Sequence, residues 1–286
     1  MFDRLRTPIV MGILNVTPDS FSDGGKFASL ELALEHSRKM IDEGVDIIDI
    51  GGESTRPGAS PVSTEQELDR VIPVVEGLRK ISDIPISVDT SSPQVITAAA
   101  QAEANLINDV RALRREGALD AAAASGLAVC LMHMQGNPET MQINPVYSDL
   151  LNDIKVFFKQ RIAACVGAGI PEERIILDPG FGFGKTTQQN LRIVNCLSEF
   201  KTLGKPLLVG LSRKSTISKI LDGMFADSGQ ELIAGSVAGA LMAVNNGASI
   251  VRVHDVAATV AAMAVQKAIN TEVAAAGYVK TTKMNE

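Results

Sequence analysis

The chain has 286 residues, of which 27 are Lys or Arg and 33 are Asp or Glu, so its formal net charge at pH 7 is −6. Hydrophobic residues make up 45% and charged residues 21%, the balance of a globular protein with ample core material. The acidic balance argues against a broad surface for nucleic acid or anionic membranes, because both need clustered basic residues. The three cysteines are widely spaced and form no C-x-x-C pattern, which fits a reducing compartment. Charges near the N-terminus, where a signal peptide needs an apolar core, predict a cytoplasmic protein.

Short runs rich in Val, Ile and Leu recur along the chain, each followed by a helical pattern. Because these runs are continuously apolar rather than alternating, they indicate strands buried on both faces, as in a parallel sheet. The predicted strands are Ile9–Val16, Val45–Gly52, Pro85–Thr90, Asn105–Val110, Leu127–His133, Arg174–Gly180, Pro206–Ser212 and Ala248–Asp255.

Two helix starts carry clear signals. Thr64 to Glu67 has a capping-box pattern, and Ser92 is expected to cap a helix whose first turn holds Pro93. The uncharged stretch 232–251 has the length of a membrane helix, but its Asn-Asn-Gly at 245–247 predicts a turn between a buried helix and a buried strand. The predicted helices occupy about 29–43, 64–80, 93–103, 115–125, 147–168, 186–203, 214–222, 230–245 and 256–270.

Strands that alternate with helices over this length predict a (β/α)8 barrel, the TIM-barrel fold. A doubly wound open sheet is the competing architecture. No linker or repeat divides the chain, so we expect one domain over residues 1–286, with residues 281–286 as a frayed tail. Three long loops, 17–28, 53–63 and 134–146, are predicted to act as lids over the C-terminal face.

Polar or charged residues stand at the C-terminal end of every predicted strand. In a (β/α)8 barrel these ends lie together on the face where active sites are built. Polar residues that only mark where strands stop would explain one or two of them, so the full set favours a functional site. In chain order they are Asn15, Glu53, Asp89, Asn108, His133, Asp178, Arg213 with Lys214, and Arg252 with His254.

The residue types at these ends indicate two kinds of ligand group. Asp89, Asn108 and Asp178 supply acceptors and an amide, which suit a ring edge with several N–H donors, although a metal site is a rival interpretation. The sequence Ser-Arg-Lys-Ser at 212–215 leads into a helix and predicts an anion site, a solvated basic turn being the alternative. His133 ends a strand but has no evident metal partner, so a purely structural role is the alternative to a functional one. His36 is expected on the surface of a helix.

The glycine-rich segment at 180–186 fails as a nucleotide-binding motif. A P-loop needs glycine at the position of Pro179, and the dinucleotide fingerprint needs glycine at the position of Lys185. What remains is a glycine-rich turn after Asp178 whose two phenylalanines, Phe181 and Phe183, are able to flank a flat ligand. A core position for Phe183 is the alternative.

Two stretches then resemble the signatures of the dihydropteroate synthase family. They are MGILNVTPDSFSDGG at 11–25 and DIGGESTRPG at 49–58, and the resemblance continues in order through 88–90, 108–109, 131–134, 177–182, 212–215 and 252–255. The family implies a pterin-binding barrel that joins 6-hydroxymethyl-7,8-dihydropterin pyrophosphate to p-aminobenzoate in folate synthesis, as a Mg²⁺-dependent transferase and sulfonamide target. It also implies a homodimer and small-molecule substrates, with no nucleic-acid or membrane partner.

The resemblance also assigns roles by motif position. It places the pterin on Asp89, Asn108, Asp178, Lys214 and Arg252. It places the pyrophosphate on Asn15, Thr55, Arg56, Arg252 and His254, with Asn15 as the Mg²⁺ ligand. It assigns the p-aminobenzoate pocket to Phe21, Pro57, Phe183 and Ser215, and catalysis to Arg56, Lys214, Arg252 and His254. A pterin-barrel methyltransferase and a pterin-binding scaffold without catalysis are the alternatives; the 54–58 and 212–215 segments disfavour the first, and the complete set of charged site residues disfavours the second.

Overall fold

The eight predicted strands form one parallel sheet that curls into a barrel. The computed structural model describes residues 8–17, 25–53, 62–136, 141–224 and 229–282. The strands are β1 (Ile9–Asn15), β2 (Ile47–Gly51), β3 (Ile86–Asp89), β4 (Leu106–Asp109), β5 (Ala128–Met132), β6 (Ile175–Asp178), β7 (Leu208–Val209) and β8 (Ile250–Val253). Each lies inside its predicted run.

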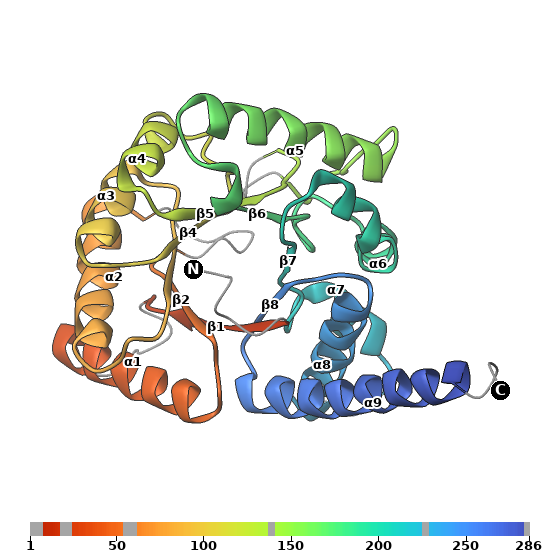
Figure 1. The fold of residues 1–286 in the computed structure, drawn as a ribbon. Helices are drawn as coiled ribbons and strands as arrows, with labels where there is room; N and C mark the ends of the chain where they lie inside the picture. The colour runs from red at the N-terminus through yellow and green to blue at the C-terminus, as the bar shows by residue number, and fades with distance from the viewer. Residues whose placement is uncertain (1–7, 18–24, 54–61, 137–140, 225–228, 283–286) are drawn as a thin grey trace.

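The strand order establishes a barrel rather than an open doubly wound sheet. Neighbours follow the order β6-β5-β4-β3-β2-β1-β8-β7, and all of these neighbouring strands pair in parallel. A bridge between Leu177 in β6 and Leu207 before β7 brings the two ends of the sheet together. The predicted (β/α)8 fold is therefore confirmed, and Figure 1 shows the helices as a ring around the strands.

The helices follow the predicted order with three differences. The predicted helix 186–203 is divided at Cys196 into an α-helix and a 3-10 helix, a second 3-10 helix spans Glu172–Arg174, and the last helix runs to Thr282 rather than 270. The α-helices are α1 (Gly25–Asp42), α2 (Thr64–Arg79), α3 (Pro93–Gln101), α4 (Ala118–Ser125), α5 (Leu150–Gly167), α6 (Thr187–Asn195), α7 (Ser215–Leu221), α8 (Gly229–Asn245) and α9 (Val256–Thr282). Since α1 starts at Gly25, the loop predicted over 17–28 ends earlier than expected. The last helix includes residues 281–282 of the predicted frayed tail, and residues 283–286 lie outside the described residues.

The predicted cap of α2 is shifted by one residue, whereas that of α3 is confirmed in its position. The capping box of α2 is formed by Ser63 and Gln66, one residue before the predicted pair, because the hydroxyl of Ser63 accepts from the Gln66 N–H and the Gln66 side chain returns to the Ser63 N–H. At α3, Ser92 has the N-cap position before Pro93, but its hydroxyl contacts the Gln94 side chain and caps no backbone amide.

Strand alternation divides the apolar residues into two layers. Val10 and Leu14 face the helices in the large core cluster, whereas Ile9 and Met11 face the barrel interior. The interior cluster is Ile9, Met11, Ile47, Leu106, Ala128, Cys130, Ile176, Leu208 and Ile250. One alternation further along several of these strands, the inward position is polar. The apolar interior therefore forms a floor, and the polar residues lie above it at the C-terminal ends.

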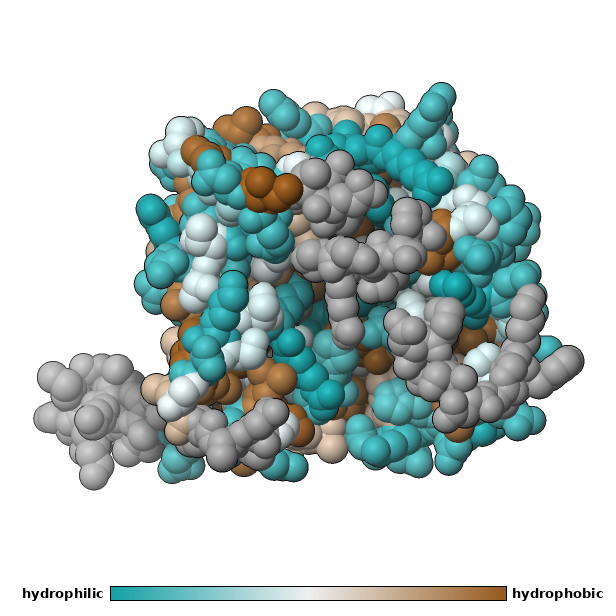
Figure 2. Space-filling model, turned by 180° about the vertical axis from the view of Figure 1, so that it is seen from behind, coloured by the Kyte–Doolittle hydropathy of each residue, from teal (hydrophilic) through white to brown (hydrophobic). Residues whose placement is uncertain are grey.

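The membrane-like stretch 232–251 has the predicted division. α8 ends at Asn245, Gly247 takes the left-handed conformation with φ of 113°, and β8 begins at Ile250. Within the described ranges, no helix is both long and apolar enough to cross a membrane. On the side opposite to Figure 1, hydrophilic residues predominate and apolar ones occur in separate small groups (Figure 2).

Candidate active site

Most of the predicted site residues lie at the C-terminal ends of the strands, as the fold requires. The described ones are Asn15, Asp89, Asn108, Asp178, Phe183, Lys214, Ser215, Arg252 and His254. Phe21, Ser54, Thr55, Arg56 and Pro57 fall outside the described residues. The expected roles of Phe21, Thr55, Arg56 and Pro57, and of the two loops that carry them, therefore stay predictions.

Arg252 of β8 is the centre of a buried ion-pair cluster inside the barrel. Its Nε donates to Asp49 Oδ2 of β2 at 2.6 Å, and its Nη2 donates to Asp89 Oδ2 of β3 at 2.9 Å. The Asn108 amide of β4 donates to the same Asp49 oxygen at 3.0 Å. These four residues, which we call the Arg252 cluster, join four strands at the level where the interior becomes polar.

The cluster keeps Arg252 charged. Burial opposes the charge, but Asp49 and Asp89 together raise the pKa of Arg252 above its ordinary value. Burial also raises the pKa of Asp89 to about 7, while Arg252 lowers it and Asp49 adds to the rise. The planar guanidinium is thus held by its edge, and the Arg252 side chain is 18% exposed, which leaves it accessible to a ligand above the cluster.

Asp49 is a site residue that the sequence prediction missed. Its side chain is fully buried, and its Oδ1 has no hydrogen-bond partner among the described residues. Asp49 lies in the middle of its apolar run, whereas the predicted site residues were those at the ends of the runs. A signal was nevertheless present, since an aspartate within a buried strand is rare unless a cation pairs with it.

Asp178 of β6 sits on the opposite side of the barrel from the two carboxylates of the Arg252 cluster in the sheet order. Its Oδ1 accepts the Gly180 N–H at 2.7 Å, which orients the carboxyl toward the interior. Burial raises the pKa of Asp178, and Lys214, Lys185 and Arg252 oppose that rise. Gly180 has φ of 71°, and a Cβ on it would lie 1.8 Å from the His133 carbonyl oxygen, so only glycine fits there.

Lys214 precedes α7 and turns its side chain back toward β6. Its Nζ donates to the Phe181 carbonyl at 2.6 Å and lies 4.5 Å from the centre of the Phe183 ring. Burial lowers the pKa of Lys214 to about 8, with Asp178 acting in the opposite direction. The ammonium is therefore placed beside a carboxylate and an aromatic face, where a flat polar ligand can use all three.

The two phenylalanines of the glycine-rich turn (residues 180–184) have different positions. Phe181 is fully buried in the large core, so the prediction that it flanks a ligand is wrong. Phe183 stays half-buried and packs on a small cluster of Val110, Met132, Met134 and Met141. This position leaves Phe183 one ring face for Lys214 or a ligand.

Three strand-end residues point away from the site into separate pairs. Glu53 receives both terminal nitrogens of Arg111 at 3.2 and 3.3 Å. His133 is buried beside Lys185, and Arg213 forms an ion pair with Asp255 at the surface. Only Lys214 of the two basic residues at 213–214 faces the barrel, because the left-handed backbone at Arg213 (φ 54°) turns the chain between them.

His254 and Ser215 complete the rim near β8 and α7. His254 donates its backbone N–H to the Ser212 hydroxyl at 3.2 Å, and its Nδ1 lies 3.1 Å from the same oxygen. Ser215, the first residue of α7, is exposed. Arg252 and His254 share the inward parity that strand alternation predicts, with Val253 packed among the helices.

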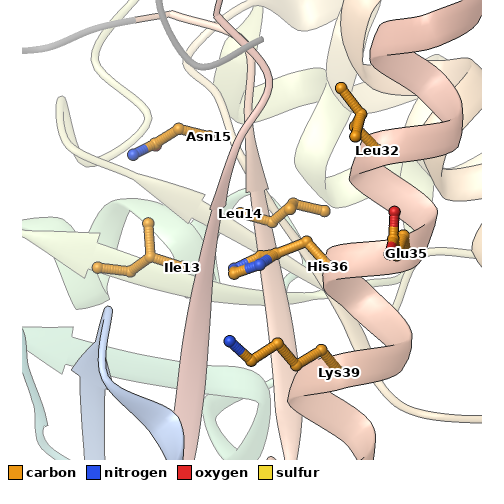
Figure 3. A pocket seen from close by; sticks show the side chains of 7 residues that line it. All are labelled: Ile13, Leu14, Asn15, Leu32, Glu35, His36 and Lys39. Carbon is orange, nitrogen blue, oxygen red and sulfur yellow. The ribbon is translucent and has the colours of Figure 1, made fainter.

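Asn15 ends β1 at the edge of a pocket of about 480 Å³, lined by Ile13, Leu14, Asn15, Leu32, Glu35, His36 and Lys39. Figure 3 shows Ile13 and Asn15 on one side of β1, and Leu14 on the side of α1, from which His36 and Lys39 point toward the strand. The pocket lies mainly between β1 and α1, so it is distinct from the Arg252 cluster. His36 is exposed on α1, as expected.

The donor set fits a magnesium ion held mainly by its substrate. Asn15 offers one half-buried amide oxygen, which lies near Gly51 at the mouth of the barrel. Among the described residues, no three His, Cys, Asp or Glu side chains are grouped to hold a metal. Mg²⁺ commonly takes one or two protein oxygens and completes its shell with phosphate and water. The rival metal site at Asp89, Asn108 and Asp178 is disfavoured, since Asp89 pairs with Arg252 and Asp178 accepts a backbone amide.

Removal of one carboxylate tests the Arg252 cluster. Asp49→Ala removes one of the two carboxylates that balance Arg252 and takes away the acceptor of the Asn108 amide, so we expect the free energy of unfolding to fall by about 3–5 kcal/mol. The control is Glu172→Ala, which breaks the Lys205 pair where Glu172 is 63% exposed and should cost less than about 1 kcal/mol. Urea unfolding of the two variants measures both values. Equal losses would contradict the importance of the cluster.

Comparison with known proteins agrees with this geometry. Residues 11–254 match the family described as pterin binding enzyme. The chain is 53% identical over 264 residues to the dihydropteroate synthase of Escherichia coli strain K12, covering 92% of each chain. A crystal structure of the Yersinia pestis dihydropteroate synthase with a sulfonamide drug superposes with a TM-score of 0.87 at 53% identity, covering 93% of this chain and 95% of that one.

A second solved structure extends the comparison to a small ligand. The Xanthomonas albilineans dihydropteroate synthase with 4-aminobenzoic acid has a TM-score of 0.86 at 48% identity, covering 92% of this chain and 93% of that one. The family match runs from within β1 to just after β8, and the compared proteins cover 92–93% of this chain. This chain therefore belongs to the pterin-binding enzyme family, as a relative of the dihydropteroate synthases.

Proposed function

We propose that this protein is a dihydropteroate synthase. It joins 6-hydroxymethyl-7,8-dihydropterin pyrophosphate to p-aminobenzoate and releases 7,8-dihydropteroate and pyrophosphate. The observation that carries the proposal is the arrangement of Asp178, Lys214 and the Arg252 cluster above an apolar barrel floor. Acceptors on both sides and a planar cation suit a flat heterocycle with several N–H groups.

The pterin ring is expected to lie between these groups. Asp178 accepts from its ring-edge N–H groups, Asn108 and Asp89 line the opposite side, and Lys214 donates to ring acceptors. The face of the ring lies against the Arg252 guanidinium. Fixed donors and acceptors of this kind orient the ligand without further ordering of the protein, because each side chain is already held by a partner.

The pyrophosphate is expected at the barrel mouth, above the pterin. Arg252 and His254 supply positive or hydrogen-bonding groups there, and Thr55 and Arg56 are predicted to join them. Asn15 would hold Mg²⁺, which neutralises charge that develops on the leaving oxygen. Preplaced cations lower the barrier because that charge grows in the transition state.

The reaction needs no protein nucleophile. The bond between the pterin methylene carbon and the pyrophosphate oxygen breaks first, and the oxygen keeps the electron pair. The p-aminobenzoate nitrogen then attacks the pterin cation, forms a carbon–nitrogen bond and loses a proton. Asp89 and Asp178 favour the cation electrostatically. Cys130, the cysteine inside the barrel, is unsuited to covalent catalysis, because burial raises the pKa of its thiol well above the ordinary value.

The p-aminobenzoate is expected beside the pterin, against Phe183 and with its carboxylate near Ser215. Phe21 and Pro57 are predicted to complete this pocket. A homodimer and a cytoplasmic location also stay predictions. The exposed apolar residues Met242, Val265 and Ile269 support a dimer contact on α8 and α9. These two helices are joined by the Gln266 side chain of α9, which donates to the Asn245 side chain of α8 at 2.7 Å.

Product formation is the direct test of the proposed function. The purified protein is incubated with the dihydropterin pyrophosphate and Mg²⁺, and pyrophosphate release is recorded with and without p-aminobenzoate. Dihydropteroate that forms only when the pterin substrate, Mg²⁺ and p-aminobenzoate are all present is the expected result. Pterin binding without release would favour the scaffold alternative, and no pterin binding would contradict the site.

Loss of one charge tests the pterin contacts. Asp178→Asn and Lys214→Ala each remove a charge-assisted hydrogen bond worth about 1.5–3 kcal/mol, so we expect the Kd for dihydropterin to rise about 10- to 150-fold. Calorimetric titration of folded protein gives these values. The control is Asp83→Asn, an exposed aspartate before β3 at the other end of the barrel, which should leave the Kd unchanged. Wild-type affinity in Asp178→Asn or Lys214→Ala would refute the assignment.

Magnesium titration tests Asn15. Asn15→Ala removes one protein oxygen from the predicted metal site, so the Mg²⁺ concentration for half-maximal rate should rise about tenfold. The pterin Kd measured without Mg²⁺ should not change, because Asn15 is not expected to touch the ring. Asn195→Ala, an exposed asparagine at the end of α6, is the matched control. A Mg²⁺ dependence identical to that of the wild type would exclude Asn15 as a ligand.

A further inference from the structure

Lys185 is a buried cation to which the proposed reaction assigns no role. The residue is 3% exposed, and its Nζ lies 2.9 Å from the Gly180 carbonyl and 2.9 Å from the Phe183 carbonyl. It also lies 3.3 Å from the His133 carbonyl and 3.1 Å from His133 Nδ1. The three N–H bonds of one ammonium thus face four acceptors. A buried charge is costly unless its donors are matched in this way, so the arrangement is specific to a lysine.

The contacts of Lys185 join the glycine-rich turn to the end of β5. Gly180 and Gly184 both have positive φ, and a Cβ on Gly184 would lie 2.8 Å from the Gln135 carbonyl oxygen. With Gly180 pressed on the His133 carbonyl, the turn meets the β5 chain at two points, and Lys185 bridges the same gap. The backbone of the turn is therefore in close contact with the chain after β5, and a side chain at Gly180 or Gly184 would prevent that contact.

The same turn presents three groups to the pterin side. The Gly180 N–H orients the Asp178 carboxyl, the Phe181 carbonyl accepts from Lys214, and the Phe183 ring lies under the Lys214 ammonium. Two of the carbonyls held by Lys185 belong to Gly180 and Phe183 themselves. A change in the position of the turn would therefore move Asp178 and Lys214 together.

We propose that Lys185 is a positioning residue for the pterin site, whose buried ammonium fixes the glycine-rich turn so that Asp178 and Lys214 are aligned for the ring. It acts through these residues and does not touch the substrate. The inference rests on the proposed function, since it names the pterin as the ligand whose binding depends on the alignment.

Burial shifts the pKa values of both Lys185 and its partner His133. Burial and Lys214 lower the pKa of Lys185 to about 7, while Asp178 opposes the change. Burial, Lys185 and Arg114 lower the pKa of His133 to about 2, so its ring is neutral and Nδ1 can accept from the ammonium. The His133 ring is in turn packed edge-on to Phe157, with centroids 4.9 Å apart. Lys185 therefore has a rigid acceptor on the β5 side.

The test is Lys185→Met, which keeps an apolar side chain of similar length and removes the ammonium. The matched control is Lys205→Met, since Lys205 has a side chain only 9% exposed and a single ion pair with Glu172 outside the site. For each variant, the melting temperature, the Kd for dihydropterin in the absence of turnover, and the KM for each substrate are measured.

We expect Lys185→Met to raise the Kd and KM for the pterin at least tenfold and the KM for p-aminobenzoate less than threefold. Lys205→Met should leave all three within twofold, even where its melting temperature falls as far. A merely structural role for Lys185 predicts lower stability with an unchanged pterin Kd in the folded fraction. That result, or an equal rise in Lys205→Met, would overturn the inference.

Asn190→Ala decides the question if Lys185→Met does not fold. Asn190, in α6, accepts the Gly182 N–H at 2.8 Å and donates to Thr216 of α7 at 3.0 Å, so it holds the same turn without carrying charge. A rise of at least fivefold in the pterin Kd, with a smaller change for p-aminobenzoate, supports the inference, and no change overturns it. Wild-type protein that binds dihydropterin but forms no dihydropteroate contradicts only the proposed reaction, because the Kd comparison still holds. Wild-type protein that binds no pterin overturns both.

Discussion

The site depends on one buried cation, Arg252, held between two carboxylates inside the barrel. Asp49, Asp89 and Asn108 come from three consecutive strands, whereas Arg252 comes from β8, 203 residues after Asp49. A buried guanidinium is costly unless opposite charges and hydrogen-bond acceptors surround it. The stability of the Arg252 cluster therefore depends on all four side chains being in place. Strand pairing sets the positions of these side chains, so formation of the Arg252 cluster depends on formation of the barrel.

Buried charge is balanced on the opposite side of the barrel in a different way. There Asp178 faces Lys214, and Lys185 is satisfied mainly by backbone carbonyls rather than by a carboxylate. The first arrangement offers a ligand a fixed planar cation, and the second offers it a carboxylate and an ammonium supported by a rigid turn. A heterocycle with donors and acceptors around its edge can meet both without further ordering of the protein, which is the physical basis for the proposed pterin site.

Strand alternation explains which site residues were predictable. Asp89, Asn108, Asp178 and Arg252 end apolar runs with the inward parity, so their convergence follows from the fold. Glu53, His133 and Arg213 also stand at strand ends, but they form pairs with Arg111, Lys185 and Asp255. Position along a strand does not reveal such partners, because each comes from a different loop or helix. Asp49 was not predicted, because it does not stand at a strand end. Its role in the site comes from its ion pair with Arg252.

The sequence by itself determined the eight strands, the barrel class and the family, since each depends on local apolar patterns or on contiguous motifs. It also predicted a glycine-rich turn after Asp178, but not the contacts that require glycine in that turn. Only the tertiary structure decided that Gly180 and Gly184 lie against the β5 chain, that Lys185 is buried, and that Arg252 is shared between two carboxylates. The reason is that the energy of a buried charge depends on neighbours brought together by folding, which no short stretch of sequence contains.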